Sequence, residues 1–273
     1  MDLTIESQLK RMLQEDIGFG DITSQLLKDE PCTAHIIAKE DCILSGVQYT
    51  KYLFELLKSQ VILLHEDGDR INNRDQVLQV SGSSKNIFAV ERTALNLLTR
   101  MSGIATETRK LVDAVQKVNP NCRVAATRKT ILRLFDKEAV VTGGGDPHRF
   151  RLDDMVLLKD NHVAILGIKE SIRRAKEISF SKKIEIEVST KEDALKAVEV
   201  GADIIMLDNM DTDSIKETVR VLKENTPHVL VEASGGITKE NITEYAKTGV
   251  DIISLGYLTH SVNAVDMSLE VSV

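Results

Sequence analysis

Polar side chains follow six consecutive apolar runs in the second part of the sequence, one set after each run. If the runs are parallel strands, these side chains meet at one mouth, because the carboxyl ends of parallel strands converge. Recurrence at the same place in six units favours a shared site over six unrelated solvated loops. In chain order the sets are TRK at 127–129, KDNH at 159–162, Glu185 with Glu187, Asp208 with Asn209, Glu232 with SGG at 234–236, and Gly256 with Thr259 and His260.

Four cations stand in or beside these sets, in a chain whose formal net charge is −7: Arg128, Lys129, Arg149 and Lys159. Arginine offers a fork of donors that matches a carboxylate or a phosphate, and lysine offers a point charge. Together the four predict a strongly anionic ligand. Taken one at a time, each is equally consistent with an ordinary surface ion pair.

Two carboxylates, Glu187 and Asp208, share the predicted mouth. Carboxylates in such a place can hold Mg²⁺, act as bases or stabilise a cationic transition state. Each could also simply neutralise a neighbouring lysine. The residue types alone leave these alternatives open.

Glycine-rich turns indicate where a phosphate binds. Ser234, Gly235 and Gly236 follow the fifth apolar run and precede a predicted helix. Such a turn presents backbone N–H groups and a helix N-terminus to an anion. In βα-barrels the phosphate site often lies in the loops after the last two strands, and the second of these loops here contains Ser254 and Gly256. The sequence has no Walker loop, GxGxxG, GxSxG or HExxH motif, which disfavours the classes that use them.

The elements that must position these residues read as repeated βα units. The apolar runs begin near residues 124, 155, 184, 204, 229 and 252, and helical patterns cover 168–178, 191–200, 213–225 and 239–248. Short β-branched runs alternating with helices are typical of a parallel sheet. There is room for a seventh strand near residue 140 or 148.

The first hundred residues have no such regular alternation. Helical patterns cover residues 5–15, 47–57 and 89–101, and strand patterns cover 33–39 and 76–80. This mixture predicts an α+β domain. The pattern changes after about residue 102, where this domain gives way to the βα units.

Composition limits the class of protein. The chain has 273 residues, of which 42% are apolar and 28% charged, as in soluble globular proteins. No stretch approaches the roughly 18–20 apolar residues of a membrane helix, and the start lacks the features of a signal peptide. The acidic balance and 4% aromatic content disfavour a nucleic-acid partner. Cys32, Cys42 and Cys122 form no CxxC pair, which favours a reducing cytoplasm.

Nine segments of this chain, taken together, resemble the quinolinate phosphoribosyltransferase family. They occur in the family's order over nearly the whole length, and the combination of ERxxLN, SGIAT, TRKT and KDNH is specific. The segments are EDIGFGDIT (15–23), ERTALNLLTRMSGIAT (91–106), TRKT (127–130), GGGDPHR (143–149), LLKDNH (157–162), EIEV (185–188), IMLDN (205–209), EASGGI (232–237) and SLGYLTHS (254–261).

The resemblance implies an N-terminal α/β sandwich over 1–101, to which 263–273 return, and an incomplete α/β barrel of the type II phosphoribosyltransferase kind over 102–262. It implies transfer of phosphoribosyl from phosphoribosyl pyrophosphate to quinolinate with decarboxylation, giving nicotinate mononucleotide, pyrophosphate and CO₂ in NAD biosynthesis. It also implies Mg²⁺ and a homodimer with shared active sites, in which Arg92 is contributed across the interface.

Matched motif by motif, the resemblance also assigns roles to residues. The substrate ligands would be Arg92, Thr127, Arg128, Lys129, His148, Arg149 and Lys159. The ligands of the 5′-phosphate would be Ser234, Gly235, Gly236, Ser254 and Gly256. The catalytic residues would be Lys129, Lys159, Glu187 and Asp208, the last two also facing the metal through pyrophosphate or water.

Two departures from the family pattern lie near the acid-binding residues. The segment after TRKT is two residues shorter than usual and lacks Pro-Gly, so that Arg133 is matched with the family's second arginine. Asp146 and Pro147 stand where Val-Asn often precedes His-Arg. These departures leave the acceptor more open than the type of reaction.

Rival functions make different demands on the sequence. A related phosphoribosyltransferase of molybdate-transport operons would use another acceptor, and nicotinate phosphoribosyltransferase would omit decarboxylation and usually has a longer chain. A non-catalytic anion binder on the same barrel would be expected to have lost Lys159, Glu187 or Asp208, which are all present. An aldolase-type barrel would need Lys159 in an apolar pocket as a Schiff base.

Overall fold

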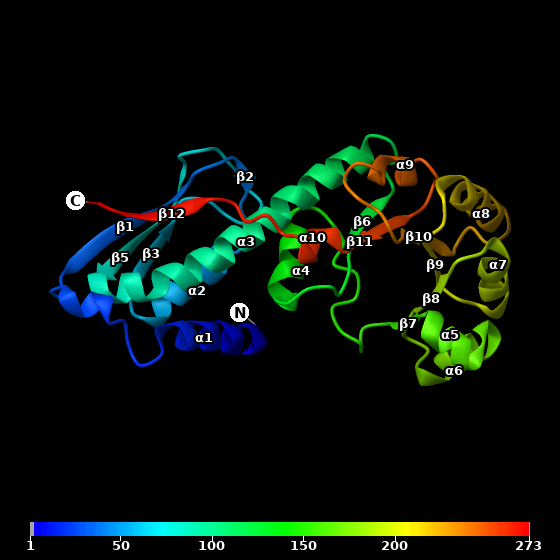
Figure 1. Ribbon diagram of the computed structural model, residues 1–273, viewed down its shortest axis with the longest axis horizontal. Helices are drawn as coiled ribbons and strands as arrows, with labels where there is room; N and C mark the ends of the chain where they lie inside the picture. The colour runs from blue at the N-terminus through cyan, green and yellow to red at the C-terminus, as the bar shows by residue number, and fades with distance from the viewer. Residues whose placement is uncertain (1–2, 273) are drawn as a thin grey trace. The chain divides into compact units, whose positions relative to one another are not determined.

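The computed structural model describes residues 3–272, which form two compact units (Figure 1). The first unit contains residues 3–109, 134–144 and 262–272, and the second contains 110–133 and 145–261. Residues 102–109, which continue helix α3 (Ser84–Gln116) past the division predicted at residue 101, pack with the first unit. Residues 134–144, which the sequence placed in the barrel, pack with the first unit.

The first unit is a mixed α/β domain built on the antiparallel sheet β12-β1-β5-β3. Strand β12, the last strand of the chain, lies at the edge of this sheet beside β1 and is drawn in red in Figure 1. Its elements are α1 (Leu3–Ile17), η1 (Thr23–Leu26), β1 (Pro31–Ala38), β2 (Cys42–Ile43), α2 (Val47–Leu56), β3 (Gln60–Leu63), β4 (Arg70–Ile71), β5 (Gln76–Ser83), the greater part of α3 (Ser84–Gln116), α4 (Arg133–Thr142) and β12 (Met267–Val271).

Helix α4 belongs to the first unit because of specific contacts with α3. Arg100 on α3 donates two hydrogen bonds of 2.8 Å to the buried carboxylate of Asp136 on α4. Just after α4, Gly143 lies so close to α3 that a Cβ there would be 2.6 Å from the carbonyl oxygen of Ala105. The prediction of a seventh strand near residue 140 is therefore wrong, since that segment is helical.

The second unit is an open α/β barrel with the parallel strand order β6-β11-β10-β9-β8-β7. Near residue 148, the other predicted position of a seventh strand, the chain forms only an isolated parallel bridge between Ala125 and Asp146. The elements are β6 (Arg123–Ala126), β7 (Val156–Leu158), α5 (Asp160–Leu166), α6 (Ile168–Ile178), β8 (Ile184–Val188), α7 (Lys191–Val200), β9 (Ile204–Asp208), α8 (Thr212–Asn225), β10 (Leu230–Ser234), α9 (Ile242–Ala246), β11 (Ile252–Leu255) and α10 (Tyr257–His260).

Alternation along the barrel strands sorts polar from apolar side chains. On β8, Glu185 and Glu187 share one face and the apolar residues between and beside them share the other, since successive strand side chains alternate. Glu187 is level with Met206 of β9, which is level with Glu232 of β10. The register therefore brings carboxylates of different strands onto the inner face of the barrel.

Local signals fix the helices that cover the outer face, as Figure 1 shows for α6, α7 and α8. The side chain of Thr190 accepts the N–H of Asp193 and begins α7, and Asp211 accepts the N–H of Ser214 and begins α8. Gly201 ends α7 in the left-handed conformation, with φ of 93°. Over residues 3–272, no helix combines the length and the hydropathy that a membrane crossing requires.

Candidate active site

A cavity of about 790 Å³ opens at the carboxyl ends of the barrel strands and collects most of the predicted site residues. Those that line it are Thr127, Arg128, Lys129, His148, Arg149, Lys159, Glu187, Asp208, Ser234, Gly235, Gly236, Ser254 and Gly256. The remaining lining residues are Ala126, Leu157, Met206, Asn209, Glu232, Ile237, Thr238, Leu255, Tyr257 and His260. The cavity thus gathers this set from the ends of six strands and from the loop that contains His148 and Arg149.

Two arginines singled out by the sequence lie elsewhere. Arg92 is exposed on α3 of the first unit. Arg133 begins α4 and is not among the lining residues of the cavity, and its Nε is buried with no hydrogen-bond partner in the part of the chain that the structure describes. The shortened segment after Lys129 therefore leads into a helix instead of adding a cation to the cavity.

Lys159 and Glu187 form an ion pair at the mouth of the cavity. Nζ of Lys159 donates to Oε2 of Glu187 at 2.7 Å, and their side chains are 47% and 15% exposed. A lysine this exposed and paired is not the apolar-pocket lysine that Schiff-base chemistry requires. The aldolase alternative is therefore not supported.

The turn after β10 is shaped for close approach of a ligand to backbone. Gly235 and Gly236 both have left-handed φ angles, of 86° and 63°. A Cβ on Gly235 would collide with Oδ1 of Asn209, whose amide donates to Asp208 and whose N–H donates to the carbonyl of Ser234. The turn therefore needs glycine there and is tied directly to the carboxylate at the end of β9.

The turn after β11 packs against Lys129. A Cβ on Gly256 would lie 3.0 Å from Cδ of Lys129 and 2.8 Å from the ring of His260. The hydroxyl of Thr259 donates to the carbonyl of Lys129 at 2.9 Å. The second glycine turn thus determines where the Lys129 side chain lies.

The arginines make the cavity electropositive at one end. Burial, followed by the charge of Arg128, lowers the pKa of Arg149. The Nε of Arg128 and the hydroxyl of Ser254 are buried and have no hydrogen-bond partner among residues 3–272. Two adjacent arginines, beside the unpaired donors of Arg128 and Ser254, suit a ligand that carries negative charge.

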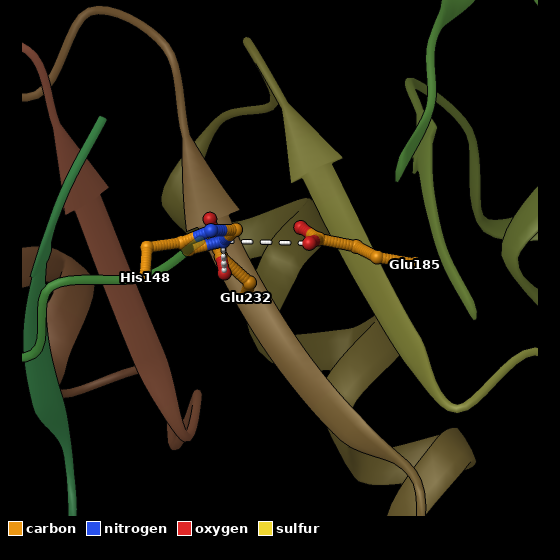
Figure 2. Close-up of side chains that lie close together, drawn as sticks. All are labelled: His148, Glu185 and Glu232. Atoms are coloured by element: carbon orange, nitrogen blue, oxygen red, sulfur yellow. Dashed lines mark hydrogen bonds and ion pairs between the residues drawn. The ribbon is translucent and has the colours of Figure 1, made fainter. Parts of the chain in front are cut away.

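His148 joins this cavity to two buried glutamates. Its Nε2 lies 3.2 Å from Oε2 of Glu232 and 3.3 Å from Oε2 of Glu185 (Figure 2). Burial by itself lowers the pKa of His148, but the two carboxylates outweigh it and raise that pKa to about 10. The Nδ1 atom accepts the N–H of Arg149 at 2.8 Å. The ring that was expected to bind substrate therefore has partners within the chain at both nitrogens.

The sequence pointed at these glutamates without giving them a role. Glu185 precedes Glu187 by two residues and Glu232 precedes Ser234 by two, so strand alternation places each on the face of a predicted site residue. Together with His148 they offer three potential metal-ligand atoms within 4.8 Å of one another. The Mg²⁺ carboxylates expected from the sequence, Glu187 and Asp208, lie nearer the mouth, at the ends of β8 and β9.

Comparison with known proteins places this architecture in one family. The models of the quinolinate phosphoribosyl transferase N-terminal and C-terminal domains match residues 21–102 and 104–270. A probable carboxylating nicotinate-nucleotide pyrophosphorylase of Methanocaldococcus jannaschii is 48% identical, over 96% of this chain and 95% of that protein. The carboxylating nicotinate-nucleotide pyrophosphorylase of Homo sapiens is 35% identical, over 98% of this chain and 92% of that protein.

A solved structure agrees over the same span. The nicotinate-nucleotide pyrophosphorylase from Francisella tularensis superposes with a TM-score of 0.91 at 36% identity, covering 98% of this chain and 96% of that one. Both domains and almost the full length are thus accounted for by the same relatives. The chain belongs to the quinolinate phosphoribosyl transferase family.

Proposed function

We propose that this chain is a carboxylating nicotinate-nucleotide pyrophosphorylase. It transfers phosphoribosyl from phosphoribosyl pyrophosphate to quinolinate and releases pyrophosphate and CO₂, leaving nicotinate mononucleotide. The observation that carries the proposal is one cavity in which four cations and two carboxylates meet: Arg128, Lys129, Arg149, Lys159, Glu187 and Asp208. Relatives that match nearly the whole chain are named for this activity.

The acceptor has two adjacent carboxylates, and the arginine end of the cavity supplies matching donors. Arg128 and Arg149 bind the quinolinate carboxylates, because their planar donor forks fit carboxylate oxygens. Thr127 and Lys129 complete this end, and Lys159 extends its positive charge toward the mouth. Quinolinate is thereby oriented with its ring nitrogen toward the donor.

The glycine turns bind the donor. Backbone N–H groups of Gly235 and Gly236, with the hydroxyl of Ser234, hold the 5′-phosphate as such turns hold anions elsewhere. Ser254 and Gly256 close the other side. The buried hydroxyl of Ser254, which has no partner among the described residues, supplies a further donor.

Two steps follow once both substrates are held, a substitution at C1′ and a decarboxylation at C2. The C1′–oxygen bond to pyrophosphate breaks as the ring nitrogen of quinolinate bonds to C1′, and positive charge develops on the ribose. Glu187 and Asp208 stabilise that charge electrostatically. The pyridinium then accepts the electron pair as the C2–carboxylate bond breaks, and a proton replaces CO₂ at C2. No covalent enzyme intermediate is required.

The carboxylates at the mouth also fit Mg²⁺. Glu187 and Asp208 offer hard oxygen ligands at neighbouring strand ends, and Mg²⁺ usually binds through one or two carboxylates together with substrate phosphates. They would hold it through water or pyrophosphate. The ion supplies charge neutralisation of the pyrophosphate leaving group. The amide of Asn209, which donates to Asp208, orients that carboxylate.

The working unit in this proposal is a homodimer with shared active sites. Apolar side chains of the first unit stand exposed, including Phe19, Ile22 and Leu26, at fractions from 79% to 116%. Apolar groups gathered in one short segment are typical of a protein interface. A second copy of the chain would cover them and bring the partner's Arg92 to the acceptor. We place the enzyme in the cytoplasm, because its three cysteines are free.

The acceptor assignment is tested by direct comparison of two acids. The protein is incubated with phosphoribosyl pyrophosphate, Mg²⁺ and either quinolinate or nicotinate, and nucleotide is measured by chromatography. We expect nicotinate mononucleotide to form with quinolinate but not with nicotinate. We expect no nucleotide from either acid when Mg²⁺ is removed with a chelator. Turnover of nicotinate without turnover of quinolinate would contradict the proposal.

A further inference from the structure

Glu185 and Glu232 have no part in the bond changes above, yet both are fully buried and meet at one histidine. Figure 2 shows His148 reaching from its loop to Glu232 on β10 and to Glu185 on β8, two strands that are separated by β9. The N···O distances are 3.2 and 3.3 Å, and the side chain of His148 is only 11% exposed. One ring nitrogen therefore joins the loop that carries His148, at the edge of the cavity, to two strands of the barrel.

The proton that makes these contacts is carried by Nε2. Nδ1 accepts the N–H of Arg149 at 2.8 Å and so presents a lone pair, which assigns the proton of the neutral ring to Nε2. The two carboxylates favour a second proton, while the bond at Nδ1 opposes it. The Nε2 proton is present in both the neutral and the charged ring. The contacts of Nε2 with Glu185 and Glu232, here called the clamp on His148, therefore exist in either charge state.

The clamped residue has an uncommon backbone conformation. His148 has a φ of 52°, in the left-handed region that costs a non-glycine residue of order 1–3 kcal/mol unless its surroundings hold it. The surroundings here are Asp146, whose Oδ1 accepts the His148 N–H at 2.7 Å, and the two glutamates at the ring. Arg149 is the next residue and lines the cavity. Because Nδ1 of His148 also accepts the N–H of Arg149, the position of the ring is coupled to the backbone that carries the Arg149 side chain.

The two buried carboxylates, Glu185 and Glu232, lie beside two groups that can carry positive charge, His148 and Arg149. Burial is the main cause that raises the pKa of Glu185, and the nearby charges of His148 and Arg149 act against it. Both carboxylate oxygens of Glu185 and Oε1 of Glu232 have no hydrogen-bond partner among residues 3–272. Glu185 therefore meets His148 as an ion pair and Glu232 meets it through a hydrogen bond, and loss of either carboxylate removes one of the two contacts at Nε2.

We propose that Glu185 and Glu232 are positioning residues for the acceptor, fixing the ring of His148 and, through it, the backbone that aims Arg149 at an acceptor carboxylate. The inference rests on the proposed function, in which Arg149 binds that carboxylate. Glu185 is not among the residues that line the cavity, so it acts through His148 and not by contact with substrate. It also lies two strands away from the phosphate turn on β10, which makes it the cleaner position to change.

The test measures binding of acceptor and donor separately, without turnover. Phthalate has the two adjacent carboxylates of quinolinate and no ring nitrogen to react. Calorimetry gives its affinity, and that of phosphoribosyl pyrophosphate with Mg²⁺, for wild type, Glu185→Gln and Glu232→Gln. We expect both variants to bind phthalate about 10-fold more weakly, because a misaimed fork loses one of its paired bonds. We expect the donor affinity of Glu185→Gln to stay within about two-fold.

A spectroscopic readout separates positioning from a general loss of structure. In ¹⁵N-labelled protein the Nε2 proton of His148, assigned with His148→Gln, should exchange slowly in wild type and fast in Glu185→Gln. The exposed Glu192→Gln on α7 is the matched control and should leave this signal and both affinities unchanged. Should either single variant fail to fold, the other carries the same comparison.

Each remaining outcome is decisive. If wild type binds phthalate and both variants bind it equally well, the positioning role is wrong while the proposed function stands. Equal losses for acceptor and donor in Glu185→Gln would also overturn it. If wild type does not bind phthalate, the proposed acceptor is wrong, and the positioning role that depends on it is wrong as well. A stoichiometric metal ion in purified wild type that both variants lose would reassign the three side chains as a metal site.

Discussion

Nζ of Lys159, just after β7, donates to Oε2 of Glu187 at the end of β8, across 2.7 Å. The pair joins two neighbouring strands at the point where the cavity opens. Lys159 keeps nearly half of its side chain in solvent, so the pair remains free to exchange its contacts for a ligand. In the proposed function, this pair holds Glu187 close to the ribose, where positive charge would develop.

Replacing Glu187 by glutamine should lower kcat by about 10²- to 10³-fold, the range seen when one electrostatic stabiliser of a transition state is removed. Stability should change little, because exposed ion pairs contribute about 0.2–1 kcal/mol. Initial rates and thermal unfolding measure the two effects. Glu217→Gln breaks a comparable pair with Lys191, between α7 and α8, and serves as the control. Equal activity losses in the two variants would deny Glu187 a special role.

The phosphate turn can be tested by matched glycine substitutions. Gly235 and Gly249 have nearly the same left-handed φ, 86° and 89°, so alanine at either adds backbone strain of about 1 kcal/mol or more. Only at Gly235 would the new Cβ collide with Asn209, whereas at Gly249 it meets Val219 at an ordinary 3.5 Å. Gly235→Ala should therefore raise KM for phosphoribosyl pyrophosphate about 10-fold or more. An unchanged KM in Gly235→Ala would remove this turn from the donor site.

The first unit should depend on the ion pair between Arg100 and Asp136. The carboxylate is fully buried and accepts two hydrogen bonds of 2.8 Å, so Asp136→Ala should reduce the free energy of unfolding by about 3–5 kcal/mol. Urea unfolding measures this change. Arg220→Gln, which breaks an exposed pair with Glu224, should cost no more than about 0.5 kcal/mol. Similar small losses in both would show that burial does not strengthen the first pair.

The proposed shared active site predicts rescue between inactive chains. Arg92→Ala and Lys159→Ala should each abolish most activity, because in this proposal one removes a cation supplied across the dimer and the other a cation of the barrel. When the two variants are dissociated, mixed and allowed to re-form dimers, each dimer that contains one chain of each kind has one site with both residues intact. A random mixture should therefore recover up to about a quarter of wild-type activity, since half of the dimers are mixed and each has one complete site. Verified mixed dimers without activity would place Arg92 in its own barrel or outside the site.

The cysteines should react unequally with a thiol reagent. Burial, assisted by Glu40 and Asp41, raises the pKa of Cys42 to about 11, and burial with Asp251 raises that of Cys122 to about 12. Thiolate is the reactive form, so at pH 8 in native protein only the half-buried Cys32 should be modified quickly. All three should react after unfolding. Rapid modification of three cysteines in the native chain would contradict the burial of Cys42 and Cys122.

The barrel strands were predictable because each is a short, mostly apolar segment, interrupted only by side chains such as Glu185 and Glu187 on β8. Their polar ends could be assigned to one mouth for the same reason. The long helix α3 (Ser84–Gln116) extends beyond the predicted 89–101 at both ends and includes Gly103, a residue with low helix propensity. In the fold that position needs glycine, since a Cβ there would collide with the carbonyl oxygen of Asn263. Such a contact joins residues far apart in sequence and leaves no local signal.

The clamp on His148 escaped prediction for a related reason. Glu185 and Glu232 each follow the pattern of a site residue, but the sequence does not show that one loop brings a histidine between strands β8 and β10. Only the register of the sheet and the left-handed backbone at His148 place them together. Residue types could be assigned to the mouth, whereas pairings between loops and strands required the fold.

The most direct test of the account follows the carboxylate that leaves. Quinolinate labelled with ¹⁴C in its 2-carboxyl group is incubated with the protein, phosphoribosyl pyrophosphate and Mg²⁺, and trapped ¹⁴CO₂ is compared with nicotinate mononucleotide formed. The account predicts one CO₂ for each nucleotide, with neither formed when phosphoribosyl pyrophosphate is omitted. Nucleotide that retains the label, or no release of ¹⁴CO₂ by a folded protein that binds both substrates, would contradict it.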